Sequence, residues 1–92
     1  MHDGFLPDLV LYGRPGCGLC AETRALLDAL LDERRTAGLP TPNFLERDIE
    51  QDAALERAWF ESIPVVELGD ARLVLATSAA KLRRLLHDQL DA

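Results

Sequence analysis

The chain has 92 residues, a length that suits one compact domain over residues 1–92 and no second one. Hydrophobic residues make up 48% of it and charged residues 28%, which excludes the composition of a disordered chain. The formal net charge of -6 argues against nucleic acid and anionic membranes as partners, because clustered Lys and Arg drive binding to both.

The N-terminal segment has no basic start followed by an apolar stretch, and no apolar run approaches the ~18 residues that would cross a bilayer. We therefore expect a cytoplasmic protein. Two cysteines are too few for the disulfide framework of a secreted domain, and in a reducing compartment a close pair more often serves redox or metal chemistry. Cys17 and Cys20 thus need a chemical explanation.

The first expected element is a buried strand over residues 8–12, a short apolar run between Pro7 and Gly13. From Cys17 onward the spacing of apolar residues predicts the longest helix of the chain, which ends at Gly38. Its expected inward residues are Leu19, Thr23, Leu26, Leu27, Leu30 and Leu31.

Residues 43–49 are expected to form the second strand. The helix between the two strands makes a crossover connection, so the strands should be parallel. A shorter helix is predicted over residues 51–59, with Leu55, Ala58 and Trp59 on its inward side.

The last third of the chain predicts a hairpin followed by a helix. Residues 64–68 and 71–75 are β-rich runs separated by a turn dipeptide, so they should pair antiparallel. The final helix should begin at Thr77 or Ser78, either of which can cap it. The pattern places on one stripe Leu82, Leu85, Leu86 and Leu90. We thus predict an α/β protein of order βαβαββα, with one mixed four-stranded sheet and three helices.

Both cysteines follow a strand end, where open α/β sheets place their chemistry. The predicted topology brings Cys17, Pro64 and residues 76–78 to the same end of the sheet. A cysteine in the first turn of a helix faces unpaired N–H groups and the positive end of the helix dipole, both of which favour the thiolate. Arg14 adds a positive charge nearby. We predict Cys17 as the nucleophile and Cys20 as the cysteine that resolves the mixed disulfide.

The other residues that could carry chemistry have plainer explanations. A tetrahedral zinc site needs four ligands, and beside the cysteines only His2 and His87 remain, each in a terminal region without companion ligands. We expect no metal site within one chain, while a metal shared between two chains stays open. Tyr12 and Trp59 are expected in the core and not as substrate platforms.

Two segments resemble motifs of the glutaredoxins. Residues 11–20 (LYGRPGCGLC) are similar to their strand-to-helix active-site motif, and residues 62–66 (SIPVV) resemble their cis-proline loop. In this order and separation the motifs cover nearly the whole chain, as in the short glutaredoxin-like proteins of bacteria. The resemblance implies a thioredoxin-like (glutaredoxin) fold, in which Pro64 is cis and Ile63 offers its backbone to a thiol substrate. The residues alone allow equally a trans proline that opens an edge strand.

The sequence departs from the glutaredoxin pattern at two places. Typical members have a proline and an aromatic residue between the cysteines, where this chain has Gly18 and Leu19. They also carry a double glycine and an acidic residue near the last helix, where this chain has residues 75–79 (LATSA). Glutathione is therefore a candidate co-substrate only, held by Arg14 and the N-terminus of the last helix.

The cysteine pair and the resemblance together predict a thiol-disulfide oxidoreductase that needs no cofactor. Its partner would be a disulfide-bearing protein or a small thiol such as glutathione, bound at Arg14, Ile63 and Pro64, and we expect a monomer. Cys17 would attack the substrate disulfide, and Cys20 would release the product. Two alternatives stay open: a noncatalytic redox sensor or binding module of the same fold, and a dimer that holds an iron-sulfur cluster with the nucleophilic cysteine and glutathione.

Overall fold

The computed structural model describes residues 6–91. Its helices and strands follow one another in the predicted order. They are β1 (Leu9–Gly13), α1 (Gly18–Thr36), β2 (Phe44–Asp48), the 3-10 turn η1 (Ile49–Gln51), α2 (Ala53–Trp59), β3 (Val65–Leu68), β4 (Ala71–Leu73) and α3 (Ala79–Leu90).

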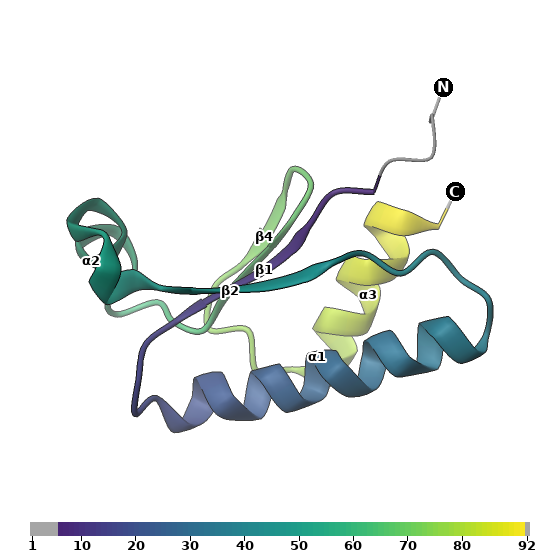
Figure 1. The fold of residues 1–92 in the computed structure, drawn as a ribbon, viewed down its shortest axis with the longest axis horizontal. Coiled ribbons are helices and arrows are strands. Elements are labelled where there is room, and N and C mark those ends of the chain that lie inside the picture. The colour runs from purple at the N-terminus through teal and green to yellow at the C-terminus, as the bar shows by residue number, and fades with distance from the viewer. Residues whose placement is uncertain (1–5, 92) are drawn as a thin grey trace.

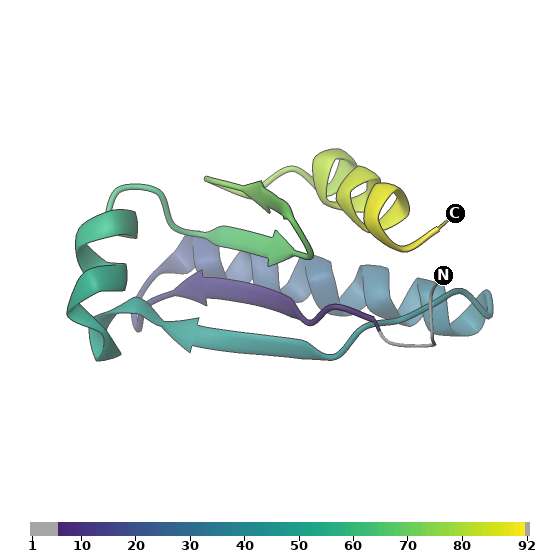
Figure 2. The same cartoon turned by 90° about the horizontal axis from the view of Figure 1, so that it is seen from above.

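The strands form a single sheet in the order β2-β1-β3-β4, which Figure 2 shows side by side. β1 and β2 are parallel, as a crossover through α1 requires, with Leu9 opposite Phe44 and Gly13 opposite Asp48. β3 runs antiparallel to β1, and β4 runs antiparallel to β3. The expected mixed four-stranded sheet is confirmed.

The helices α1 and α3 pack on the same face of this sheet (Figure 1). Because successive side chains of a strand point to opposite faces, Leu9, Leu11, Val66 and Leu68 share that face. They form the main core with the leucines of the two helices, which are Leu27, Leu30, Leu31, Leu82, Leu85 and Leu86. One face of the sheet is thereby covered by α1 and α3.

The short helix α2 lies at one end of the sheet, beside the C-terminal end of β1 (Figure 1). Leu55 and Trp59, one turn apart on α2, pack against a second and smaller core at that end. This second core consists of Tyr12, Cys20, Ile49, Ile63 and Val65, and Cys17 packs against it. The cysteine pair therefore lies at the second core, with Cys20 in it and Cys17 against it, and outside the main core.

Several details differ from the sequence expectations. Leu19 is 49% exposed, and its assignment to the inward face of α1 was wrong. At ~100° per residue, Cys20 occupies the inward position and turns Leu19 to the side. Ala58 is exposed too, because only Leu55 and Trp59 of the short α2 meet the core. Ile49 begins η1 instead of ending β2.

The fourth strand is also shorter than predicted. It ends at Leu73, and the apolar residues Val74 and Leu75 that follow are 52% and 55% exposed. Leu75 has a φ of 49°, in the left-handed region, so the backbone cannot continue as a strand there. Residues 71–75 are all compatible with a strand, so the sequence contains no sign that the strand ends at Leu73.

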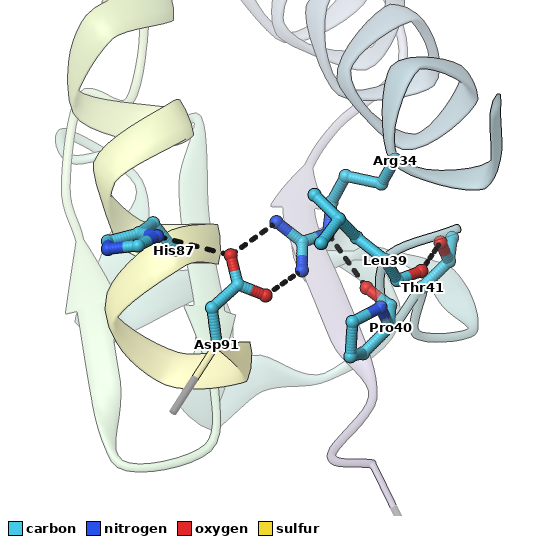
Figure 3. Close-up of polar contacts among 6 residues, drawn as sticks. All are labelled: Arg34, Leu39, Pro40, Thr41, His87 and Asp91. Carbon is cyan, nitrogen blue, oxygen red and sulfur yellow. Dashed lines mark hydrogen bonds and ion pairs between the residues drawn. The ribbon is translucent and has the colours of Figure 1, made fainter. Parts of the chain in front are cut away.

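Arg34 is a buried charge that the sequence analysis did not single out. Its Nη1 donates to Asp91 Oδ2 at 3.2 Å, its Nη2 donates to Asp91 Oδ1, and its Nε donates to the Pro40 carbonyl at 2.7 Å (Figure 3). The hydrogen bonds from Arg34 hold the pKa of the Asp91 carboxyl below its usual value. These contacts join the C-terminal ends of α1 and α3.

Within residues 6–91, no helix combines the length and the apolar character needed to cross a bilayer.

Candidate active site

The turn between β1 and α1 presents the first cysteine. Gly16 has a φ of 80°, a left-handed conformation that glycine adopts without strain, and the Cys17 N–H donates to the Arg14 carbonyl at 3.3 Å. Cys17 then adopts the extended conformation of an N-cap residue, with φ -85° and ψ 104°, and α1 begins at the next residue. The turn thus fixes the Cys17 sulfur at the N-terminus of the longest helix.

Cys17 and Cys20 are joined by a disulfide, with their Cα atoms 5.2 Å apart. The backbone N–H of Cys20 donates to Cys17 Sγ at 3.1 Å, so the sulfur takes the place of the oxygen that normally caps a helix. Cys17 is half-buried, whereas Cys20 is only 5% exposed. Of the two sulfur-bearing side chains, that of Cys17 is the more open to an incoming molecule.

Gly13 at the end of β1 is a site residue that sequence reasoning missed. A Cβ at this position would lie 2.9 Å from Cys20 Sγ and 3.0 Å from Cys20 Cβ, closer than carbon atoms normally approach. The absent side chain is what leaves room for the buried cysteine. The available signal was a glycine at the end of an otherwise apolar strand, which often marks a close approach.

The loop before β3 faces the same second core. The Ile63–Pro64 peptide bond is cis, as the glutaredoxin resemblance implied. The Ala76 N–H donates to the Pro64 carbonyl at 2.8 Å, and Thr23 Oγ1 donates to the Ala76 carbonyl at 2.7 Å. Through these bonds α1, the proline loop and the segment before α3 meet at one end of the sheet, as the predicted topology requires.

The backbone of Ile63 is partly engaged. Its N–H donates to the Trp59 carbonyl at 3.2 Å, at the C-terminal end of α2. Across residues 6–91, no hydrogen bond ends on the Ile63 carbonyl oxygen. Among the backbone groups of Ile63, its carbonyl is thus the one that the described part of the chain leaves for another molecule.

Arg14 lies on the other side of the cysteine pair, in the exposed turn. It lines a cavity of about 310 Å³ together with Cys20, Arg47 and Asp48. The Asp48 carboxylate accepts the Glu50 N–H at 2.8 Å, so its charge is partly committed to the start of η1. Arg14 is thus positioned beside the disulfide, where a negatively charged group could meet its guanidinium.

Tyr12 and Trp59 were expected in the core. Tyr12 is part of the second core, and Trp59 packs against it. Tyr12 is buried, and its hydroxyl donates to Glu67 Oε1 at 2.9 Å. Burial, and after it the hydrogen bond to Glu67, raises the pKa of Tyr12 above its usual value, so the phenol stays neutral. Trp59 is half-buried, with the Arg72 guanidinium 4.7 Å from its ring centroid.

The structure also bears on the histidines. Within residues 6–91, no group of three or more His, Cys, Asp or Glu side chains is placed to hold a metal ion. His87 is exposed on α3, and its Nδ1 lies 3.1 Å from Asp91 Oδ2. His2 lies outside the described residues.

The fold and the site together define a class of protein. A mixed sheet of this order, a Cys-x-x-Cys pair at the N-terminus of the first helix and a cis-proline before the third strand are the features of a thioredoxin-like domain. The model of the glutaredoxin-like domain (DUF836) matches residues 8–92, and the chain belongs to this family.

Solved structures agree with this assignment. The X-ray structure of the structural genomics target protein XcR50 from X. campestris has 30% sequence identity and a TM-score of 0.69, covering 87% of this chain and 96% of that one. The solution structure of XcR50 gives 29% identity and a TM-score of 0.69, covering 92% and 99%. Protein Ne2328 from Nitrosomonas europaea, 24% identical, shares the fold with a TM-score of 0.67, covering 92% and 98%. No curated protein matches the chain.

Proposed function

We propose that the protein is a thiol-disulfide oxidoreductase in which Cys17 is the nucleophile and Cys20 the resolving cysteine. The observation that carries this proposal is the capping of α1 by Cys17 Sγ, which accepts the Cys20 N–H at 3.1 Å. A backbone N–H at a helix N-terminus stabilises negative charge, so the same position favours the thiolate when the pair is reduced.

The proposed reaction has two exchange steps. The Cys17 thiolate attacks one sulfur of a substrate disulfide, forms a mixed disulfide and expels the first substrate thiolate, which takes up a proton. Cys20, after losing its own proton, attacks the Cys17 sulfur, and the second substrate thiolate leaves. The substrate is reduced by two electrons and the cysteine pair is oxidised to its disulfide. Glutathione or a thioredoxin-type reductase then returns the pair to the dithiol.

The difference in burial supports this division of labour. Cys17 is half-buried and reachable, whereas Cys20 is 5% exposed and is packed under Gly13. A sulfur shielded in this way cannot easily meet a bulky disulfide, yet it is close enough to attack its neighbour. Arg14, the Ile63 carbonyl and Pro64 are the proposed substrate contacts around the pair, and glutathione is one candidate for them.

A redox titration of the purified protein tests this proposal. The protein is equilibrated in glutathione buffers of graded poise, its free thiols are trapped, and the intact mass is measured for wild type, Cys17→Ser and Cys20→Ser. We expect a Cys17–Cys20 disulfide in wild type and a mixed disulfide of Cys17 with glutathione in Cys20→Ser. Cys17→Ser, the matched control, should form far less of the glutathione adduct because its remaining thiol, that of Cys20, is buried.

The turnover of a small disulfide, bis(2-hydroxyethyl) disulfide, completes the test. We expect rapid reduction by wild type and a loss of at least about 100-fold in Cys17→Ser, since the attacking thiolate is gone. A disulfide that forms without such turnover would instead identify a noncatalytic redox sensor. No disulfide at any poise would contradict the proposal outright.

A further inference from the structure

Cys20 must lose a proton before it can act in the proposed reaction. Only the thiolate attacks a disulfide, and Cys20 is 5% exposed, so it has little contact with the bulk water that serves an open thiol. A nearby group of the protein that takes up this proton would therefore speed the resolving step.

The register of the sheet places Asp48 beside the buried sulfur. Gly13 and Asp48 are paired across β1 and β2, and paired residues of neighbouring strands point to the same face. An ideal Cβ on Gly13 would lie 2.9 Å from Cys20 Sγ, so this is the face on which Cys20 packs. Because neighbouring strands are about 4.8 Å apart, the side chain of Asp48 begins about one strand spacing from the contact of Gly13 with Cys20.

Cys20 and Asp48 also line the same cavity, which has a volume of about 310 Å³. The other lining residues come from β1, β2 and the turn before α1, so the cavity lies on the β2 side of β1, whereas the proline loop precedes β3 on the other side. A water molecule occupies roughly 30 Å³ in the liquid, so this polar cavity has room for water. It offers the Cys20 proton a path that does not pass Cys17.

Among the charged residues at this cavity, Asp48 has a carboxylate oxygen available for a proton. Arg14 and Arg47 are donors and cannot accept one. The Glu46 carboxylate is already held by Arg24, whose Nε lies 2.8 Å from Glu46 Oε1. Asp48 is half-buried, and its Oδ1 accepts a backbone N–H of η1 at 2.8 Å. Within residues 6–91, no hydrogen bond or ion pair ends on Asp48 Oδ2.

We propose that Asp48 is the proton acceptor for Cys20 in the resolving step. The proposal rests on the oxidoreductase function and adds a third residue to its chemistry. The Cys20 S–H gives its proton to a water molecule in the cavity, and that water gives one of its own to Asp48 Oδ2. The Cys20 thiolate then attacks Cys17 Sγ, and the substrate thiolate leaves and takes up a proton from the solvent. Asp48 afterwards returns its proton to the solvent.

The two exchange steps are followed in one reaction of the reduced protein with excess bis(2-hydroxyethyl) disulfide, quenched with acid at successive times. The intact mass shows first the mixed disulfide on Cys17, which reports attack, and then the Cys17–Cys20 disulfide, which reports resolution. At neutral pH, Asp48→Asn should slow resolution by at least about 10-fold and leave attack within about two-fold of wild type. This substrate is uncharged, so the lost carboxylate does not alter its approach.

The dependence on pH separates proton transfer from a merely structural role. As the pH rises from neutral to about 9.5, a cysteine thiol ionises without an acceptor, so the difference between Asp48→Asn and wild type should narrow. The other charged groups at the cavity keep their charge over this range; they are Arg14, Glu46 and Arg47 at its wall and Arg24, which reaches Glu46 from α1.

Glu46→Gln is the matched control, because it removes a carboxylate from the same cavity. Arg24 already engages that carboxylate, so resolution should stay within about two-fold of wild type. Urea unfolding of the oxidised proteins checks the fold. The amide oxygen introduced by Asp48→Asn can still accept the N–H of η1, so its midpoint should lie close to that of wild type.

Two results would overturn Asp48 as the acceptor while the oxidoreductase function stands. One is resolution in Asp48→Asn as fast as in wild type, and the other is a defect of equal size at every pH. If wild type forms neither the mixed disulfide nor the Cys17–Cys20 disulfide, the proposed function itself is wrong, and this inference with it.

Discussion

Gly13 controls the space around the buried cysteine. The strand β1 ends directly over Cys20, and the position that a Gly13 side chain would take is already filled by the Cys20 sulfur. Gly18, at the first position of α1, is the opposite case, because nothing lies within 4 Å of its missing Cβ. Two glycines at the same site therefore have different physical roles.

Gly13→Ala should destabilise the protein by about 1–3 kcal/mol, because the new methyl group displaces Cys20 or β1 from a packed position. The measurement is the free energy of unfolding in urea, with the cysteine pair kept oxidised. The displaced sulfur should also resolve mixed disulfides more slowly. An unchanged free energy would show that Cys20 can move aside freely.

Gly18→Ala is the matched control at the same scale. Its side chain enters open space and its φ is not left-handed, so the substitution should be neutral or should raise the free energy of unfolding by up to about 1 kcal/mol. A loss as large as that of Gly13→Ala would mean that any change in this turn is harmful and that the close approach of Gly13 to Cys20 is not the cause.

At the scale of elements, the contact between Arg34 and Asp91 joins parts of the chain that are far apart in sequence. Arg34 is on α1, Asp91 caps α3, and the Pro40 carbonyl belongs to the loop that leads to β2 (Figure 3). The side chains of Arg34 and Asp91 are 9% and 18% exposed, so each charge is balanced mainly by the other.

Asp91→Asn should destabilise the protein at neutral pH, because it leaves the Arg34 guanidinium without its counter-charge. The folded-state pKa of Asp91 is lowered from its ordinary 3.8. The stabilisation is therefore fully present above the unfolded pKa and is lost as pH falls through the folded one. Urea unfolding midpoints at pH 7 and below pH 3.8 should show a difference from wild type that narrows in acid.

Glu33→Gln is the control for this pH dependence. Glu33 pairs with Arg83 between the same two helices at 2.6 Å, but both side chains are more than half exposed. Such a pair contributes little, so the midpoint should hardly change at either pH. A loss equal to that of Asp91→Asn would show that any charge between α1 and α3 matters and that burial does not.

The order of the helices and strands could be predicted from the sequence, because apolar periodicity marks the helices and short apolar or β-rich runs mark most strands. The C-terminal ends of β2 and β4 could not. The buried role of Arg34 could not, since its partner Asp91 lies 57 residues away and charge on a helix normally indicates solvent. The site was predictable at the cysteines and Pro64, where a motif exists. The close approach at Gly13 and the conformation of Leu75 depend on tertiary contacts that no local pattern reports.

At the scale of the whole molecule, charge and size determine how charged substrates approach. The chain has a net charge of -6 and measures 36 × 26 × 17 Å. At low ionic strength the Debye length is about 30 Å, so the field of the entire protein reaches a substrate near the disulfide. Arg14 is a local exception of opposite sign.

Salt should therefore have opposite effects on the proposed reaction for cationic and for anionic substrates. Raising the ionic strength from about 0.01 M to about 0.1 M should lower kcat/KM for the cationic disulfide cystamine and raise it for anionic glutathione disulfide. The uncharged bis(2-hydroxyethyl) disulfide should respond least. If the two charged substrates respond in the reversed sense, Arg14 and not the net charge dominates their approach, and if both respond in the same direction, charge does not govern the approach at all.

The helix cap formed by Cys17 has one further consequence. In the oxidised pair the amide hydrogen of Cys20 faces Cys17 Sγ, the sulfur that changes its bonding partner in the proposed cycle. The rate at which this amide hydrogen exchanges with solvent deuterium should depend on the charge of Cys17 Sγ, and it can be measured on the unlabelled protein. Under the proposed cycle, amide exchange at Cys20 should therefore differ between the oxidised and the reduced cysteine pair.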